Sequence, residues 1–221
     1  MAFGFFKKKK KVESTDSRFL NLTIKEVIQE TADAVSLVFE EPESGKLNYK
    51  PGQFITLILT INGKKIRRAY SLSSSSYLGE NPTITIKRVE GGIMSNHINS
   101  NLKAGDKIEI MEPMGSFTTE ISSDNKRHVF LVGGGSGITP LLSIAKSILS
   151  QESNSKVSLI YANQNEASII FDDRIKKLKE DNSGNLDIVH FLENPSSDWS
   201  GSKGRLDISK LKTTFADLND N

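Results

Sequence analysis

Apolar and polar residues alternate over the first half of the chain, in short stretches separated by turn-forming residues. At residues 83–89 the order is Thr-Ile-Thr-Ile-Lys-Arg-Val, and a period of two residues predicts half-buried strands. Asn62-Gly63 separates residues 54–61 from residues 66–72 and favours a two-residue type I′ hairpin. Further strands are predicted at residues 20–24, 35–39 and 107–111, with one helix at residues 93–102. This pattern predicts a small antiparallel barrel.

The period of the apolar residues changes after about residue 125. Strands are predicted at residues 129–132, 157–161 and 186–191, and helices at residues 140–149 and 168–179. Strands that alternate with helices indicate βαβ units and a parallel sheet. The polar run at residues 122–125 predicts a boundary, so we expect domains at 18–122 and 125–221 and a β + α/β fold class.

A glycine-rich turn at the start of the second domain joins a predicted strand to a predicted helix. Four glycines lie between Val132 and Ile138, and Pro140 fits the first helical turn. Glycine lets the backbone approach a ligand, and a helix start offers unpaired N–H groups to a phosphate. The spacing is neither Gly-x-Gly-x-x-Gly, whose third glycine would fall at Ile138, nor a P-loop. We expect a nucleotide phosphate here; the alternative is a tight turn without a ligand.

Two further segments of the first domain carry candidate chemistry. On a strand, Arg68 and Tyr70 project to one face and Ser71 to the other. An arginine fork suits a pyrophosphate, a tyrosine ring suits stacking on a flat heterocycle, and a serine hydroxyl can reach a ring nitrogen. The segment 91–95, Gly-Gly-Ile-Met-Ser, is expected to open a helix with Ser95 as its N-cap, which gives a second candidate phosphate site.

The composition excludes several classes of protein. The 221 residues are 25% charged and carry a net charge of +2, which argues against a dedicated nucleic-acid binder. Without cysteine, the chain has no disulfide framework and no thiolate iron–sulfur site, in keeping with a cytoplasmic location. The three histidines lie far apart, so no metal site is expected. The apolar runs are too short for a transmembrane helix.

The basic run 7–11 follows a very short apolar stretch and lacks the order of a secretory signal. We expect residues 1–17 to form a basic disordered tail, because such charge blocks usually stay solvated. The alternative is a weak tether to a membrane surface or to an acidic partner.

The order of the three motifs resembles the ferredoxin–NADP(H) reductase superfamily, in which a flavin-binding barrel precedes a pyridine-nucleotide-binding α/β domain. The matching segments are 68–71, 91–95 and 133–140, supported by 51–53 and 161–171, and the resemblance covers about residues 18–211. Within the superfamily the chain is most similar to the reductase subunits of phenylacetyl-CoA epoxygenase systems, which implies phenylacetate catabolism. Those reductases carry a [2Fe–2S] domain after the reductase module.

The resemblance implies an NAD(P)H-dependent flavoprotein reductase that passes electrons through FAD to an iron–sulfur centre or an oxygenase component. Tyr70 and Ser71 would be the catalytic residues. FAD would be bound by Arg68, Ala69, Tyr70, Ser71, Lys87, Gly92, Met94, Ser95 and Thr139. NAD(P) would be bound by Gly134, Gly135, Ser136, Gly137, Ile138, Pro140, Asn163 and Gln164. The alternatives are a flavin reductase or flavohaemoglobin-type reductase module, and a non-catalytic flavin- or nucleotide-binding regulatory subunit.

The sequence departs from the family pattern in two respects. Members that use NADPH often carry an arginine where this chain has Asn163-Gln164-Asn165, so nothing here favours NADPH. Only three of the family's five parallel strands are predicted, and the Cys-Gly-Pro segment and [2Fe–2S] domain are absent. We therefore expect a fragment or a shortened protein, with the strand 129–132 at the sheet edge and FAD bound better than NAD(P)H.

Overall fold

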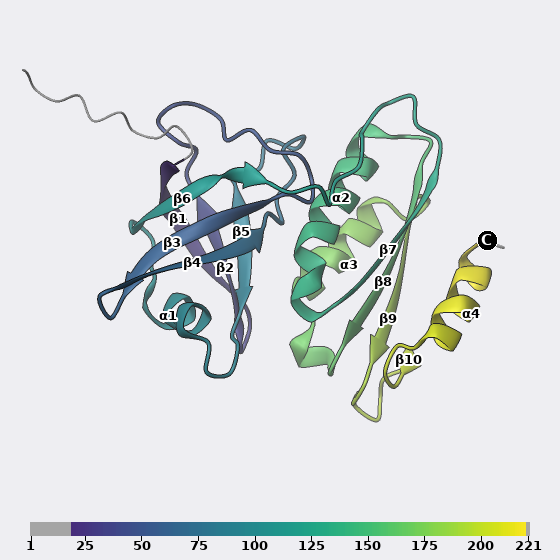
Figure 1. The fold of residues 1–221 in the computed structure, drawn as a ribbon. Coiled ribbons are helices and arrows are strands. Elements are labelled where there is room, and N and C mark those ends of the chain that lie inside the picture. Colours follow the sequence, from purple (N-terminus) through teal and green to yellow (C-terminus); the bar gives the residue numbers. More distant parts are fainter. Residues whose placement is uncertain (1–18, 220–221) are drawn as a thin grey trace, which may run out of the picture.

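The computed structural model describes residues 19–219, which form an antiparallel sheet followed by a parallel sheet (Figure 1). The predicted basic tail therefore lies outside the described residues. The order of the two sheets along the chain confirms the predicted fold class. Both sheets are amphipathic layers that bury one or both faces against other elements, as the two apolar periods require.

The first sheet has six strands in the order β4-β3-β6-β1-β2-β5. Its elements are β1 (Phe19–Thr31), β2 (Ala34–Phe39), β3 (Phe54–Ile61), β4 (Lys64–Ser71), β5 (Thr83–Lys87), α1 (Ile93–Asn101) and β6 (Lys107–Met114). Asn62 and Gly63 both have positive φ, as the type I′ hairpin between β3 and β4 requires. A single bridge from Leu72 to Ile84 brings the end of β4 toward β5, so the sheet curls into a barrel.

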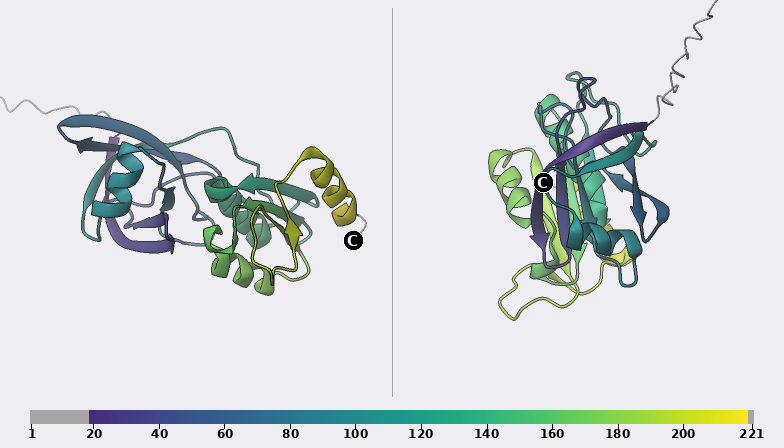
Figure 2. Two further views of the ribbon diagram at one scale, coloured as in Figure 1. Left: turned by 90° about the horizontal axis from the view of Figure 1, so that it is seen from below. Right: turned by 90° about the vertical axis from the view of Figure 1, so that its left-hand side faces the viewer.

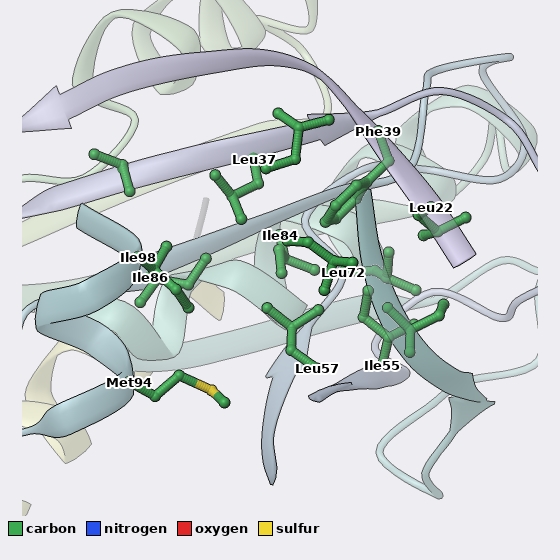
Figure 3. Packing of buried hydrophobic residues seen from close by; sticks show 14 of the residues in the cluster. Leu22, Leu37, Phe39, Ile55, Leu57, Leu72, Ile84, Ile86, Met94 and Ile98 are labelled. Atoms are coloured by element: carbon green, nitrogen blue, oxygen red, sulfur yellow. The ribbon is translucent and has the colours of Figure 1, made fainter. Parts of the chain in front are cut away.

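The barrel core explains why this half of the sequence alternates (Figure 3). Every second residue of the strands points inward, and Leu37, Phe39, Ile55 and Leu57 are fully buried. The helix α1 covers one end of the barrel and adds the apolar side chains of Met94 and Ile98 to the same core. A register slip of one residue would expose this whole set, so the pairing of β3 with β4 is strongly determined.

The second sheet has four parallel strands in the order β10-β9-β8-β7. Its elements are β7 (His128–Gly134), η1 (Gly135–Gly137), α2 (Ile138–Gln151), β8 (Lys156–Asn163), η2 (Glu166–Ser168), α3 (Asp172–Asp181), β9 (Leu186–Leu192), β10 (Ser202–Lys203) and α4 (Ile208–Asn219). Helices α2 and α3 cover the face toward the barrel, and α4 covers the opposite face (Figures 1 and 2). Within the described residues, β7 is an edge strand.

The structure corrects three predictions for the second sheet. The short strand β10 pairs with β9, so four strands are present instead of three. The helix expected from residue 168 begins at Asp172, because Asn165 caps the preceding 3-10 turn and Phe171 adopts a left-handed conformation. Helix α4 was not predicted; it packs Phe215 edge-on against Phe130 of β7, with ring centroids 4.9 Å apart.

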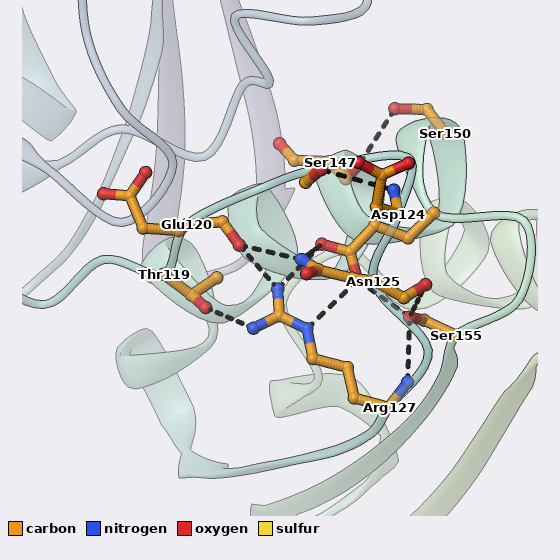
Figure 4. A network of polar contacts seen from close by, with 10 residues as sticks. Thr119, Glu120, Asp124, Asn125, Arg127, Ser147, Ser150 and Ser155 are labelled. Carbon is orange, nitrogen blue, oxygen red and sulfur yellow. Dashed lines mark hydrogen bonds and ion pairs between the residues drawn. The ribbon is translucent and has the colours of Figure 1, made fainter.

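A buried ion pair fixes the segment that links the two sheets (Figure 4). Arg127 donates to both oxygens of the fully buried Glu152 carboxylate, at 3.0 and 2.7 Å. Asn125 and Ser155 add hydrogen bonds of 2.8 Å to the same carboxylate. Burial alone would raise the pKa of Glu152, but these hydrogen bonds and the guanidinium hold it below its usual value. Arg127 also donates a hydrogen bond to the Thr119 hydroxyl, so it connects the start of the linking segment with its end.

Polar contacts hold the barrel against α2 and α3. The Ser143 hydroxyl donates to the Ser74 carbonyl oxygen at 2.6 Å, and the Lys146 ammonium lies 2.5 Å from the Glu80 carboxylate. An ion pair of 3.0 Å joins Arg174 to Glu30. These contacts fix the distance between the barrel and the parallel sheet, which decides what can bind between them.

Candidate functional site

Arg68, Tyr70 and Ser71 lie on β4, the edge strand of the barrel sheet. Arg68 pairs with Leu57 and Tyr70 with Ile55, so both side chains project from the core-facing side of the sheet. The Tyr70 ring packs against the barrel core, and burial raises the pKa of its hydroxyl. Tyr70 and Ser71 are only half-buried, so both remain open to a ligand.

The polar groups of this edge are available for a ligand. Arg68 is exposed, and its guanidinium donates only to the carbonyl oxygen of Arg67, at 2.8 Å. Among the residues that the structure describes, no carboxylate pairs with Arg68 and no side-chain bond engages the hydroxyls of Tyr70 and Ser71. Ala69 is exposed between them. A guanidinium, an aromatic face and two hydroxyls on one open edge fit the pyrophosphate and flat ring of a flavin nucleotide.

The start of α1 differs from its prediction. The N-cap is Gly92, and Ser95, expected to cap the helix, lies inside its first turn. The buried Ser95 hydroxyl accepts a hydrogen bond from the Val89 N–H at 3.1 Å, so it holds the turn before the helix. The Gly92 N–H donates to the Val89 carbonyl at 2.9 Å, and a Cβ at Gly92 would lie 2.6 Å from the Ser95 oxygen. Ser95 and the Gly92 N–H thus have partners within the chain, and their predicted contacts with FAD stay predictions.

The Met94 side chain belongs to the barrel core and is only 3% exposed, so it is not available to a ligand. The contribution of Met94 to a ligand is limited to the backbone N–H in the first turn of α1, where the N–H groups lack helical partners.

The glycine turn between β7 and α2 presents backbone to open space. Gly135 has φ +50°, and a Cβ at Gly135 or Gly137 would meet no atom within 4 Å. Gly133 serves packing instead, because a Cβ there would lie 2.6 Å from the Leu141 side chain. The turn is held from below by the buried Tyr161, whose hydroxyl donates to the Gly135 carbonyl at 2.9 Å.

Two residues predicted at this turn are engaged elsewhere. The Ile138 side chain is fully buried, and its N–H donates to the Gly135 and Ser136 carbonyls; its nucleotide contact stays a prediction. Thr139, predicted to lie near FAD, is 5% exposed, and its hydroxyl donates to the Ser136 carbonyl at 3.1 Å. Both residues shape the turn, and Pro140 follows them in the first turn of α2.

A cavity of about 410 Å³ lies where the barrel meets the glycine turn. Its lining consists of Lys87 at the end of β5, residues 134–136, residues 162–164 and Glu193. Asn163 is 7% exposed, and neither polar atom of its side-chain amide has a hydrogen-bond partner in the described chain. A buried amide without partners is costly unless a ligand satisfies it. The cavity therefore fits the phosphates and ribose of a dinucleotide.

Lys87 was predicted to bind FAD. In the structure it lines this cavity, together with Gly134 and Ser136 of the glycine turn. Its ammonium lies 3.5 Å from the Asp33 carboxylate, which orients it without burying it. The sequence analysis did not predict that Glu193 lines the cavity. It also did not predict that Tyr161 supports the glycine turn. The available signal for Glu193 was its position two residues after a predicted parallel strand, at the same sheet edge as Gln164.

Comparisons with known proteins assign each half of the chain to a family of domains. The Oxidoreductase FAD-binding domain matches residues 20–119, and the Oxidoreductase NAD-binding domain matches residues 131–221. The crystal structure of a ferredoxin NADP+ reductase from Neisseria gonorrhoeae with bound FAD and NADP has a TM-score of 0.74, with 27% identity over 92% of this chain and 79% of that chain. The chain belongs to the ferredoxin–NADP reductase superfamily. Its predicted cofactors, FAD and a nicotinamide nucleotide, are thereby confirmed.

Curated relatives within the superfamily are components of oxygenase systems. The ferredoxin reductase component of 3-ketosteroid-9-alpha-monooxygenase from Rhodococcus rhodochrous is 42% identical over 80% of this chain and 50% of its own length. A component of 1,2-phenylacetyl-CoA epoxidase from Escherichia coli is 31% identical over 90% of this chain and 56% of its own length. The predicted resemblance to the epoxygenase reductases is confirmed, but the identity to the Rhodococcus component is higher, at 42% against 31%. The chain spans about half the length of the curated relatives it matches.

The described residues lack two other features. No helix among residues 19–219 combines the length and apolar character that a membrane crossing needs. No group of three potential metal ligands gathers within the same residues.

Proposed function

We propose that this chain is the reductase module of an oxygenase system, which passes electrons from NAD(P)H through FAD to an iron–sulfur centre or an oxygenase component. The observation that carries the proposal is the cavity in which Lys87 of the barrel faces the glycine turn of the parallel sheet. It lies at the junction of the matched FAD-binding and NAD-binding domains, and the names of the curated relatives support the oxygenase partner.

The barrel edge would bind and orient the flavin. FAD, when bound, supplies the chemistry that connects a two-electron donor with a one-electron acceptor. Arg68 would bind the pyrophosphate with the donors that its bond to the Arg67 carbonyl leaves open among the described residues, and the half-buried Tyr70 ring would fix the plane of the isoalloxazine. Ser71 would donate its hydroxyl hydrogen bond to a flavin ring nitrogen. We assign the catalytic role to Tyr70 and Ser71 on this basis, because they would touch the reacting ring system.

The parallel sheet would bind the nicotinamide nucleotide mainly through its backbone. The N–H groups of Gly134, Gly135 and Ser136 would receive the pyrophosphate at the start of η1 and α2, where the partial positive charge lies. Lys87 would neutralise the same phosphates from the barrel side, and the unpaired amide of Asn163 would bind the nucleotide from the end of β8.

The finer identity of the partner follows from the sequence. An oxygenase of the phenylacetyl-CoA epoxidase type is the partner that the resemblance predicts, and a [2Fe–2S] domain outside this chain would be the first acceptor. We propose a cytoplasmic location for the same system. The Rhodococcus relative favours a steroid oxygenase as the partner. Electron transfer measured with each purified oxygenase would distinguish the two candidate partners.

The proposed function is tested with the chain loaded with FAD and separated from free flavin. NADH added anaerobically should bleach the flavin absorbance, and a one-electron acceptor such as ferricyanide should restore it. Ser71→Ala should retain FAD but reduce the rate of bleaching at least about tenfold, because it lacks the hydrogen bond to the reacting ring. Ser76→Ala, a control in the loop before β5, should leave the rate unchanged.

Three results would contradict parts of this proposal. A chain that retains no FAD is not a flavoprotein module. A chain that retains FAD but is not reduced by NADH or NADPH would favour the non-catalytic regulatory role. Rapid transfer to free flavin, with none to a protein-bound iron–sulfur centre, would favour a flavin reductase.

A further inference from the structure

We propose that the cavity between α3 and β9 is a binding site for a small neutral phenol, whose ring packs beside Trp199 and whose hydroxyl hydrogen-bonds to His190. The cavity has a volume of about 410 Å³, within the range of small-molecule pockets. Among the described residues, it shares no lining residue with the cavity at the glycine turn. The inference does not rest on the proposed function, because it concerns a second site in the parallel-sheet domain.

The walls of this cavity are mostly apolar. Ile169, Ile175 and Ile188 line it, and Ile169 and Ile175 belong to the buried core beneath. The outer edge of β9 is not covered by a strand beside Ile188, because in the described chain β10 pairs with β9 only at Phe191 and Leu192. An apolar space of this kind favours an apolar ring that removes its surface from water.

Trp199 gives the cavity a fixed aromatic surface. Its indole N–H donates to the Ser202 carbonyl at 3.2 Å, and a Cβ at Gly201 would lie 2.7 Å from the indole ring. The His190 ring meets Trp199 edge-on, with ring centroids 6.3 Å apart. Because aromatic rings favour edge-on and offset contacts, a planar ring fits beside this pair better than an aliphatic chain does.

His190 gives the cavity its unpaired polar group. Among the described residues, neither nitrogen of its ring has a hydrogen-bond partner, and only Nδ1 is buried, which leaves Nε2 as the nitrogen open to a ligand. Burial lowers the pKa of His190, so the ring is neutral at neutral pH. A neutral imidazole either donates or accepts at Nε2, according to its tautomer, and a hydroxyl group can match both. A phenol hydroxyl therefore supplies the partner that the chain does not.

The charges around the cavity favour a neutral ligand over an anion. Its lining holds three carboxylates and two ammonium groups, from Glu166, Asp172, Glu180, Lys176 and Lys179. The Lys176 ammonium lies 2.6 Å from the Asp172 carboxylate, and the Lys179 ammonium lies 3.2 Å from the Asp187 carboxylate. Both cations therefore have acidic partners already, and an aromatic carboxylate would meet an excess of negative charge.

The site lies next to the support of the glycine turn without being part of the dinucleotide cavity. The centroids of the His190 and Tyr161 rings are 5.8 Å apart, and the Tyr161 hydroxyl donates to the Gly135 carbonyl. A phenol in this cavity is therefore not a competitor of the dinucleotide, and the two should bind at the same time.

The test uses the fluorescence of Trp199, which is the only tryptophan of the sequence and therefore reports on the cavity directly. The whole chain, without added flavin, is titrated with para-cresol. We expect a saturable change of the fluorescence with a dissociation constant of about 1 mM or tighter. Saturating ADP-ribose, a fragment of NADH, should not displace para-cresol, and para-toluate, the corresponding carboxylate, should bind more weakly than para-cresol.

The role of His190 is tested by comparing para-cresol with para-xylene, which has a methyl group in place of the hydroxyl. His190→Phe keeps a ring and removes both nitrogens, so the preference for para-cresol over para-xylene should fall about fivefold. His190→Leu measures the same ratio should His190→Phe fail to fold. His97→Phe, a control on α1 of the barrel, should keep the preference of the wild type. Retained para-xylene binding shows that a variant is folded.

The absence of both a saturable fluorescence change and a heat of binding with para-cresol in the wild-type chain would overturn the site. An unchanged preference in the His190 variants would overturn the role of His190. Tighter binding of para-toluate than of para-cresol would contradict the neutral ligand, and displacement by ADP-ribose would contradict a separate site. The proposed function is tested with FAD and NADH, so it stands or falls independently of these results.

Discussion

The barrel and the parallel sheet present their candidate sites in opposite ways. The barrel offers side chains on an edge strand, with the free donors of Arg68 and the half-buried Tyr70 ring. The parallel sheet offers backbone at a glycine turn, which the buried Tyr161 supports from below. A side-chain site can be removed without harm to the fold, whereas a backbone site depends on the fold itself. The two sites should therefore respond differently to substitution.

The largest effect is expected at the linker that both regions share. Arg127→Ala leaves the fully buried Glu152 carboxylate without its cation, and removal of one partner of a buried pair costs about 3 kcal/mol. Urea denaturation should show this loss in the free energy of unfolding. Lys177→Ala removes half of the exposed pair with Asp181 and should cost less than about 0.5 kcal/mol. Equal losses in the two variants would show that the linker network does not stabilise the fold.

The same network predicts the acid response of the protein. Hydrogen bonds hold the pKa of Glu152 below its ordinary value of 4.5, so its contribution to stability is present above about that pH. The contribution is lost as the pH falls through the lowered pKa of the folded protein. In urea titrations at decreasing pH, Glu152→Gln should start less stable and lose less stability in acid than the wild type. A parallel loss in both proteins would contradict this assignment.

The backbone site should be sensitive to a single methyl group. Gly135 has φ +50°, a conformation that costs an alanine about 1–2 kcal/mol, and relaxation of the turn would move the backbone that lines the cavity. We expect Gly135→Ala to weaken ADP-ribose binding about tenfold. Gly184→Ala lies in the loop before β9, where a Cβ would meet no atom within 4 Å. It should bind ADP-ribose like the wild type, and equal weakening in both variants would rule out a specific role for the turn.

The smallest effect is expected at the support of the turn. Tyr161→Phe removes the hydrogen bond to the Gly135 carbonyl and keeps the buried ring, a loss of about 1 kcal/mol. ADP-ribose binding should weaken only a few-fold, and FAD binding should not change. A loss of FAD binding in this variant would contradict the view that the two sites are independent.

Local patterns in the sequence were enough to predict the barrel strands and the turn of the parallel sheet. Alternation identified the barrel because its core buries every second residue, and the glycines identified the turn because few other residues adopt its conformation. Helix α4 was missed although Leu211, Phe215 and Leu218 have helical spacing and the Asp207 carboxylate caps the Lys210 N–H. The apolar spacing and the capping residue together predict a helix in this segment, so α4 could have been predicted from the sequence.

Other features depended on distant contacts and could not be predicted. Serine is a residue type that often caps helices, and Ser95 was expected to do so. The N-cap is instead Gly92, which packs closely against Ser95, so the helix begins before the predicted cap. Lys87 follows a barrel strand and yet lines the cavity of the other domain, because the arrangement of the two sheets brings β5 against the glycine turn. Such positions follow from domain packing, which a local pattern does not contain.

FAD is proposed to bind at the β4 edge through side chains. Arg67 and Arg68 are adjacent on this strand but project to opposite sides, and Arg67 instead lies 5.9 Å from the centre of the Phe19 ring. Fluorescence titration of the whole chain with FAD tests the claim directly. Arg68→Ala should weaken FAD binding at least about tenfold, through loss of a charge-assisted contact, while Arg67→Ala should bind like the wild type. Equal FAD affinity of the two variants would contradict the account.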